Sequence, residues 1–223
     1  MKELRYTLLS DGSSDQALLP ILTWLLREHH VGCAIQSEWA DLRRLARRPQ
    51  TLPGRIIRSL ELYPCALLFV HRDAERESRE HRKVEINRAI AEASQSVNVP
   101  VRICVVPVRM QEAWLLFDEA ALRRAAGNPN GRQPLEIPPH SQLEQLPDHT
   151  HVRYKLLREA SGLQGRRRKK IPVGKWASRI AAFITDFTPL RALPAFNALE
   201  NDVEHVIREQ EWSASPETVK RGT

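Results

Sequence analysis

The sequence predicts an α/β fold: a mainly parallel sheet flanked by helices, with a helical extension at the C-terminal end. Three short apolar runs end at turn residues, at polar residues or at a proline: Leu4–Ser10, Cys65–Val70 and Val101–Val106. Segments with helical spacing separate the runs, and strands alternating with helices form parallel sheets through right-handed crossovers. We therefore expect strands near 5–10, 66–71 and 101–106 to be neighbours in one sheet.

The first strand leads directly into a helix. The turn sequence Ser-Asp-Gly-Ser-Ser-Asp follows it at positions 10–15, and Leu18, Leu22, Leu25 and Leu26 then recur at helical spacing to about residue 29. Ser13 and Gln16 have the spacing of a capping box, which predicts that the Ser13 side chain begins the helix.

The middle of the chain predicts two more strand–helix units. A short strand is expected near Cys33–Gln36, and Pro53 can open a helix that ends near Leu62. The run Cys65–Val70 is continuously apolar, which is typical of a strand covered on both faces. A helix that carries Ile86 and Ile90 on one face separates this run from the strand at 101–106.

Beyond the last strand the sequence changes character, and we divide the chain accordingly. Residues 1–126 form the predicted α/β core, which ends in a helix over Gln111–Asp118 that continues or restarts through Ala120–Ala126. Residues 127–150 hold five prolines and form the predicted connector. Residues 151–223 form a predicted basic helical region that packs on the core, with helices near 152–160, 176–184 and 194–211.

Composition restricts the class of protein. The hydrophobic share of 42% and the charged share of 27% are ordinary for a folded domain. The three cysteines, Cys33, Cys65 and Cys104, show no Cys-x-x-Cys spacing, which argues against a zinc ribbon or a disulfide framework and favours the reducing cytoplasm. No signal-peptide pattern opens the sequence and no apolar run approaches the roughly 20 residues of a membrane span, so we expect no membrane partner.

The net charge of +7 is concentrated in one segment. Residues 151–180 hold ten Lys and Arg residues against one acid, Glu159, so the remainder of the chain is slightly acidic. The run Arg166, Arg167, Arg168, Lys169 and Lys170 is the densest part, and such a patch is typical of binding to a polyanion such as nucleic acid. The alternative is a solvated loop that keeps the protein in solution.

Acidic residues follow two of the predicted strands. Asp11 comes after the first strand, and Asp73 and Glu75 come after the Cys65–Val70 strand. Functional residues of parallel sheets collect at the carboxyl ends of the strands, and side chains two apart on extended backbone point the same way. Clustered carboxylates favour Mg²⁺ or Mn²⁺, so Asp11, Asp73 and Glu75 are the predicted metal ligands. The alternative for each acid is a turn, cap or ion-pair role.

Two further residues belong to this prediction. Glu112 follows the strand at 101–106 and is a candidate fourth acid, with a helix cap or an ion pair as its alternative role. His71 stands beside the acidic motif and could position a phosphate or a water molecule.

The two acidic motifs resemble those of Toprim domains. The stretch Leu8–Asp15 is similar to the first Toprim motif, an apolar strand that ends in an acid–glycine pair, and Leu67–Glu75 is similar to the second, which ends in acid-x-acid. Toprim domains occur in topoisomerases, primases, small RNA-maturing nucleases and overcoming-lysogeny-defect nucleases. The stretches Val108–Leu116 and Leu193–Phe196 resemble a bacterial family of Toprim-like proteins associated with defence against phage.

The resemblance implies a Toprim-like fold and a role for each acid. Asp11 would take the position of the general acid/base, and Asp73 and Glu75 the positions of the metal ligands. Two departures matter: the family usually has Glu where this chain has Asp11, and Asp where it has Glu75. Metal binding tolerates such exchanges, whereas proton transfer depends on hydrogen-bond reach and is more sensitive to them.

Three functions from different classes follow. The first is a metal-dependent, phosphodiester-cleaving nuclease that acts on nucleic acid, in phage defence together with a partner protein of a defence system. The second is a non-catalytic Toprim-like regulatory or sensing subunit that binds a metal-bound nucleotide or a partner protein. The third is an interaction protein in which the acids are structural.

Overall fold

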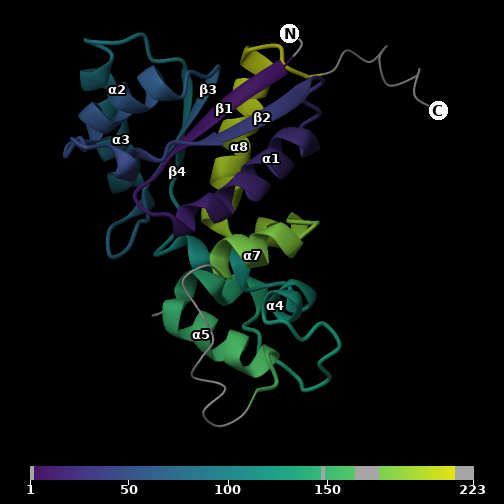
Figure 1. The fold of residues 1–223 in the computed structure, drawn as a ribbon. Coiled ribbons are helices and arrows are strands. Elements are labelled where there is room, and N and C mark those ends of the chain that lie inside the picture. Colours follow the sequence, from purple (N-terminus) through teal and green to yellow (C-terminus); the bar gives the residue numbers. More distant parts are fainter. Residues whose placement is uncertain (1–2, 147–148, 164–175, 214–223) are drawn as a thin grey trace.

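A four-stranded parallel sheet forms the centre of the molecule in the computed structural model, which describes residues 3–146, 149–163 and 176–213 (Figure 1). The strands are β1 (Glu3–Leu9), β2 (Ala34–Trp39), β3 (Leu67–His71) and β4 (Val101–Val105), in the order β2-β1-β3-β4. All three pairings are parallel. The predicted α/β fold and the adjacency of its three strands are therefore confirmed, and the short strand expected near residue 33 forms one edge.

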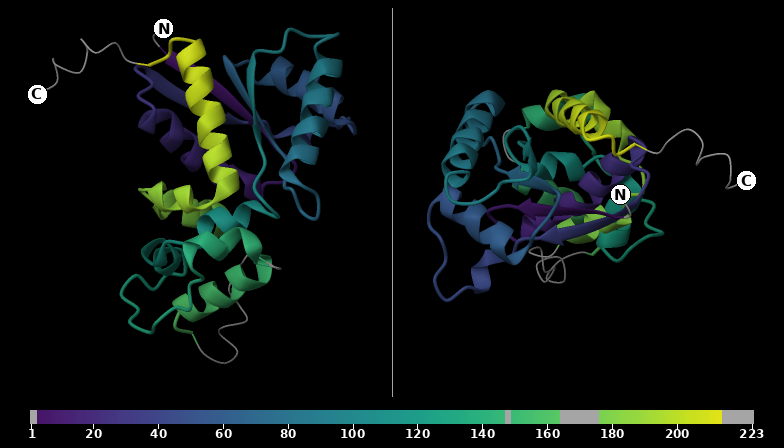
Figure 2. Two further views of the ribbon diagram at one scale, coloured as in Figure 1. Left: turned by 180° about the vertical axis from the view of Figure 1, so that it is seen from behind. Right: turned by 90° about the horizontal axis from the view of Figure 1, so that it is seen from above.

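Helices cover both faces of the sheet (Figure 2). On one face lie α1 (Leu18–Glu28) and the long α8 (Pro194–Glu209), and on the other lie α2 (Leu52–Leu62) and α3 (Arg79–Ala93). Within β3, Leu67 and Phe69 belong to the first apolar cluster, and Leu68 and Val70 belong to the second. This explains why the run is continuously apolar, since each face of the strand is buried.

A group of helices lies beyond the carboxyl ends of the strands (Figure 1). It consists of α4 (Glu119–Ala125), α5 (His149–Ala160) and α7 (Trp176–Phe183), and α7 packs against a 3₁₀ helix, Ser14–Ala17, that directly follows β1. Trp114 is fully buried here and meets Phe196 of α8 edge to face, with 5.4 Å between the ring centroids. These helices therefore close over the edge of the sheet at which the predicted acids lie.

The structure corrects several predicted boundaries. Ser13 makes no side-chain capping bond, and the 3₁₀ turn Ser14–Ala17 precedes α1. The helix expected from Gln111 is a 3₁₀ helix, Gln111–Leu115, and α4 begins separately because the Asp118 carboxylate accepts a hydrogen bond from the Ala121 N–H (2.9 Å). Further 3₁₀ helices span Leu42–Arg44, His140–Gln145 and Thr188–Ala192. The connector predicted for 127–150 thus holds local structure, and α5 begins within it.

Candidate functional site

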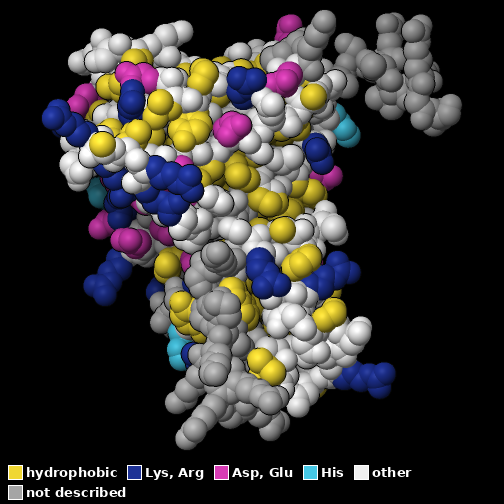
Figure 3. Space-filling model, viewed as in Figure 1, with side chains coloured by type: hydrophobic (Ala, Val, Ile, Leu, Met, Phe, Trp, Pro, Cys, Tyr) yellow, Lys and Arg dark blue, Asp and Glu magenta, His cyan; other side chains and the backbone are white. Residues whose placement is uncertain are grey.

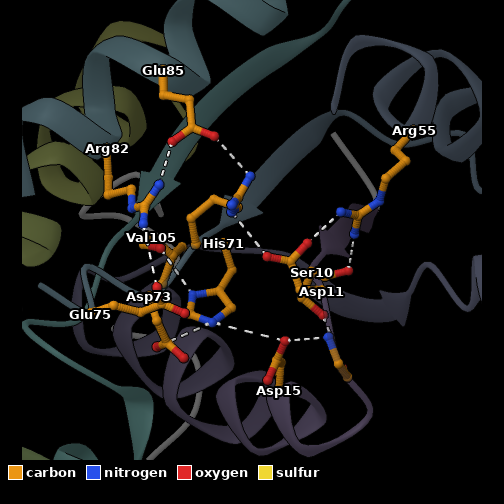
Figure 4. A network of polar contacts seen from close by, with 12 residues as sticks. Ser10, Asp11, Asp15, Arg55, His71, Asp73, Glu75, Arg82, Glu85 and Val105 are labelled. Atoms are coloured by element: carbon orange, nitrogen blue, oxygen red, sulfur yellow. Dashed lines mark hydrogen bonds and ion pairs between the residues drawn. The ribbon is translucent and has the colours of Figure 1, made fainter. Parts of the chain in front are cut away.

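Three polar segments meet at the carboxyl edge of the sheet. One follows β1 and carries Asp11 and Asp15, the second ends β3 and carries His71, and the third follows β4 and carries Gln111 and Glu112. Because β1 and β4 flank β3 in register, the ends of these strands stand side by side. The short apolar strands thereby place polar side chains next to one another, and Figure 4 shows those that follow β1 and end β3.

His71 lies at the centre of this group and is buried. Its Nδ1 donates to the backbone carbonyl oxygen of Val105 (3.0 Å), and since a carbonyl only accepts, Nδ1 carries a hydrogen. The other ring nitrogen, Nε2, lies 3.6 Å from the Asp73 carboxylate and 3.9 Å from the Asp15 carboxylate. Nε2 therefore faces two carboxylates at once, and a cation between these three groups would be attracted by both of them.

Asp15 is held rigidly in this position. Its carboxylate accepts hydrogen bonds from the Gly12 N–H (2.8 Å), the Ser14 hydroxyl (3.1 Å) and the Gln111 side-chain amide (2.6 Å). Only 7% of its side chain is exposed. The sequence pattern does not distinguish Asp15 as a site residue, although Asp15 ends the first Toprim-like motif. Its bond to Gln111, which the chain contributes only after β4, is what brings it into the site.

Asp73 is a partly enclosed acid, with 22% of its side chain exposed, and it is poorly stabilised as an anion. Burial raises its pKa to about 7, and the negative charges of Glu112 and Asp15 act in the same direction. His71 and the hydrogen bond from the Gln111 N–H (2.9 Å) oppose this rise. Desolvation outweighs both, so Asp73 resists ionisation near neutral pH unless a cation joins it.

Glu112 is buried beside Asp73 and is ion-paired to α5. One carboxylate oxygen, Oε1, lies 2.5 Å from Nη1 of Arg153, itself largely buried. The other oxygen, Oε2, makes no hydrogen bond to any described residue, and the same holds for the side-chain carbonyl oxygen of Gln111. Buried acceptors without donors are costly, and a bound cation or ordered water would satisfy them.

A row of ion pairs lies on the more exposed side of the site, which we call its mouth (Figure 4). It consists of Asp11, Arg55, Arg72, Glu75, Arg82 and Glu85. Arg55 of α2 donates to the carbonyl oxygen of Ser10 and to the Asp11 carboxylate. Arg72 lies with its Nε 2.9 Å from Asp11 and its Nη1 2.9 Å from Glu85.

The row continues through α3. Arg82 contacts Glu85 (2.7 Å) and Glu75 (3.6 Å). Acidic and basic side chains therefore alternate from Asp11 to Glu75, and both of these predicted metal ligands already have arginine partners.

The expectation that Asp73 and Glu75 point the same way is wrong. β3 ends at His71, and Glu75 has a left-handed backbone conformation (φ 54°), in which its N–H donates to the carbonyl oxygen of Arg109 (2.7 Å). The carboxylate of Asp73 faces His71 and Gln111, whereas that of Glu75 is exposed and faces Arg82. The alternation of an extended strand does not reach Glu75.

The predicted acids thus fall into two groups. The inner group contains the buried Asp15, His71, Gln111 and Glu112 together with Asp73, of which 22% of the side chain is exposed, and Asp15 was not among the predicted acids. The mouth contains Asp11 and Glu75 in ion pairs. Among the described residues no three His, Cys, Asp or Glu side chains are already arranged as a metal-binding group. The inner group nevertheless fits a hard cation in its chemistry, because it consists of three carboxylates, the amide oxygen of Gln111 and the imidazole nitrogen of His71, with two acceptors unsatisfied.

The comparisons with known proteins add no relative. No family model, curated protein or solved structure matches the chain.

The predicted nucleic-acid-binding run from Arg166 to Lys170 lies outside the described residues. In the part of the chain that the structure describes, no helix is both long enough and apolar enough to cross a membrane.

Proposed function

We propose that the chain is a Mg²⁺- or Mn²⁺-dependent enzyme that cleaves phosphodiester bonds of nucleic acid, a nuclease. The observation that supports this most is the inner group of Asp15, His71, Asp73, Gln111 and Glu112 at the carboxyl edge of a parallel sheet. This group has more hydrogen-bond acceptors than donors, which suits a cation. Arginines lie at its mouth, and guanidinium groups suit a phosphate. The Toprim resemblance of the motifs around Asp11 and Asp73 points to the same chemistry.

Each side chain of the site has a role in this proposal. Asp73 would be the central ligand, with Asp15 and the unpaired oxygen of Glu112 beside it. The cation, when bound, neutralises a phosphate oxygen and stabilises the oxygen that leaves. Asp11, half exposed at the mouth, would orient the metal or move a proton, and the resemblance implies the second of these roles. Glu75, exposed and paired to Arg82, would reach the cation only after a change of conformation.

His71 would act as a positioning residue. Its Nδ1 bond to Val105 fixes the ring, so that Nε2 stays between the carboxylates of Asp15 and Asp73. A fixed ring orients both acids without reaching the mouth, where a substrate would bind.

A nuclease assay tests the proposal. Single- and double-stranded DNA and RNA are incubated with the purified chain, with Mg²⁺, with Mn²⁺ and with EDTA. We expect metal-dependent cleavage that Asp73→Asn abolishes and Glu61→Gln leaves unchanged, since Glu61 is an exposed residue of α2 paired to Arg58. Thermal melting with each metal is the second measurement. Wild type that neither cleaves nor gains thermal stability with either metal would contradict the proposal.

The ion pairs at the mouth favour a second candidate. Asp11 and Glu75 are neutralised by arginines, which suits a non-catalytic Toprim-like subunit that senses a metal-bound nucleotide or a partner protein. In the same assay this alternative predicts a metal-dependent thermal shift and binding of nucleotide or oligonucleotide, without cleavage of any substrate.

The cellular setting is also part of the proposal. The three thiols, Cys33, Cys65 and Cys104, are all free, which suits a reducing compartment, and we place the protein in the cytoplasm. A role in phage defence, with a partner protein from a defence system, rests on the family resemblance. Protection of cells against phage that is lost in the Asp73→Asn variant would support this role.

A further inference from the structure

Two arginines converge on the Asp11 carboxylate at the mouth of the site. Arg55 comes from α2 and Arg72 from the end of β3, and they reach different oxygens of the same carboxylate. Each guanidinium also keeps a second contact, Arg55 with the carbonyl oxygen of Ser10 and Arg72 with Glu85. Both guanidinium groups are thereby oriented independently of Asp11, and Figure 4 shows Arg55 pointing toward Ser10 and Asp11.

Asp11 is the most accessible member of this trio. Its side chain is 49% exposed, whereas those of Arg55 and Arg72 are 10% and 25% exposed. An ion pair with one partner so open to water contributes little to stability. A competing anion can therefore displace Asp11 at low cost, while the arginines stay in place.

We infer that Arg55 and Arg72 form a binding site for a phosphate group, in which the Asp11 carboxylate stands in for phosphate oxygens until a phosphate displaces it. Guanidinium groups donate paired hydrogen bonds that match phosphate as well as carboxylate. Two of them aimed at one point supply the convergent donors that a tetrahedral anion needs. The surroundings are mixed in charge, with acidic and basic side chains gathered beside α2 and α3 (Figure 3), so the two guanidinium groups themselves supply the attraction.

The inference deepens the proposed function and rests on it in one respect. A phosphate held by Arg55 and Arg72 would lie at the same carboxyl edge of the sheet as Asp73, because Arg72 and Asp73 both follow β3. The displaced Asp11 carboxylate would then be free to turn toward a cation held there. Cation and phosphate should therefore strengthen each other's binding, and such coupling is reciprocal.

The decisive test removes the stand-in. In Asp11→Asn both arginines keep their anchors but lose the competing charge, so metal-free protein should bind phosphate more tightly than wild type. Releasing a partly exposed ion pair corresponds to a gain of up to about fivefold. Binding is measured by calorimetry in EDTA at low ionic strength. The probes are inorganic phosphate and a short oligodeoxythymidylate without terminal phosphates, which separate binding of free phosphate from binding of a phosphodiester.

Two further variants make the test specific. The double variant Asp11→Asn with Arg72→Gln should lose the gain in phosphate affinity that Asp11→Asn shows, because one of the two guanidinium donors is missing. For the same reason Arg72→Gln alone should bind phosphate no more tightly than wild type. Arg58→Gln is the matched control, since Arg58 lies on the same helix as Arg55 but is exposed and pairs with Glu61. It should bind as wild type does. Thermal melting of each variant verifies folding.

The outcomes separate the inference from the proposed function. If folded Asp11→Asn binds both probes no more tightly than wild type, the phosphate site is overturned, whatever the metal assays show. If it gains affinity for either probe, the site is supported even when no metal binds. With Mn²⁺ present, wild type should bind the responding probe more tightly than in EDTA, and no change would overturn the coupling.

Discussion

The Nε2 atom of His71 lies 3.9 Å from the carboxylate of Asp15, so a histidine at the end of β3 faces an acid that follows β1. The carboxylate of Asp73, which follows β3, lies 3.6 Å from the same nitrogen. Since His71 donates through Nδ1 to Val105, its ring ties β4 to both acids. This histidine is therefore the junction of the three segments that build the site.

Replacing His71 should destabilise the protein. His71→Ala leaves the carbonyl oxygen of Val105 without its donor and the carboxylates of Asp15 and Asp73 without the group between them. The loss should be about 2 kcal/mol in the free energy of unfolding, the usual cost of a buried unsatisfied polar group. Urea unfolding measures it. The control is His81→Ala, at an exposed site near the start of α3, which should change stability very little. Equal stabilities of the two variants would contradict the role of His71.

The Asp73 side chain should make the metal-free protein less stable as pH rises. Its pKa is about 7 in the folded chain against an ordinary 3.8, so folding favours its protonated form. The stabilising contribution is complete below about pH 4 and disappears as pH rises through about 7. Asp73→Asn should abolish this dependence, and above pH 7 it should exceed wild type by at most about 4 kcal/mol.

Melting curves in EDTA from pH 5 to pH 8 provide the measurement. The quantity to compare is the stability difference between wild type and Asp73→Asn at each pH, because other groups titrate in both proteins. The exposed-site variant Glu61→Gln should track wild type throughout. A difference that does not vary with pH would show that water reaches Asp73 more freely than its burial indicates.

The strands could be predicted from sequence because local pattern determines them. β3 is continuously apolar since successive residues, such as Leu68 and Phe69, belong to different apolar clusters. A run of this kind is typical of a strand that is buried on both faces. The positions of Asp11 and Asp73 at strand ends followed from the same pattern. Turn residues after a buried strand indicate where the strand ends.

The partners of the acids could not be predicted, because they depend on packing between distant segments. Asp15 is held in the site by a hydrogen bond from Gln111. Asp11 is held by Arg55 of α2, a helix that follows β2 in the chain. Glu75 turns away because its N–H bonds to the carbonyl oxygen of Arg109, which imposes a left-handed conformation. No spacing within the motifs encodes these three contacts.

The basic run should supply affinity for nucleic acid without sequence preference. Replacing Arg166, Arg167 and Arg168 together by Ala removes three charges that can neutralise phosphates and release counterions. Binding should weaken on every sequence tested, and the slope of log affinity against log salt should become shallower by up to about 2 to 3. Fluorescence anisotropy at several salt concentrations measures both quantities. Equal affinities of variant and wild type at low salt would make the run a solubilising segment.

The buried pair between Glu112 and Arg153 should behave asymmetrically when its partners are removed. It joins the strand edge to α5, both side chains are buried, and the Nε of Arg153 makes no hydrogen bond to any described residue. Arg153→Met leaves the Glu112 carboxylate buried and uncompensated beside Asp73, which should cost about 3 to 5 kcal/mol. Glu112→Gln with Arg153→Met removes both charges, so it should cost clearly less than Arg153→Met alone. Denaturant unfolding of the two variants and of Glu112→Gln completes a double-mutant cycle. If the double variant is the least stable of the three, the pair contributes net stability and desolvation is the smaller effect at this position.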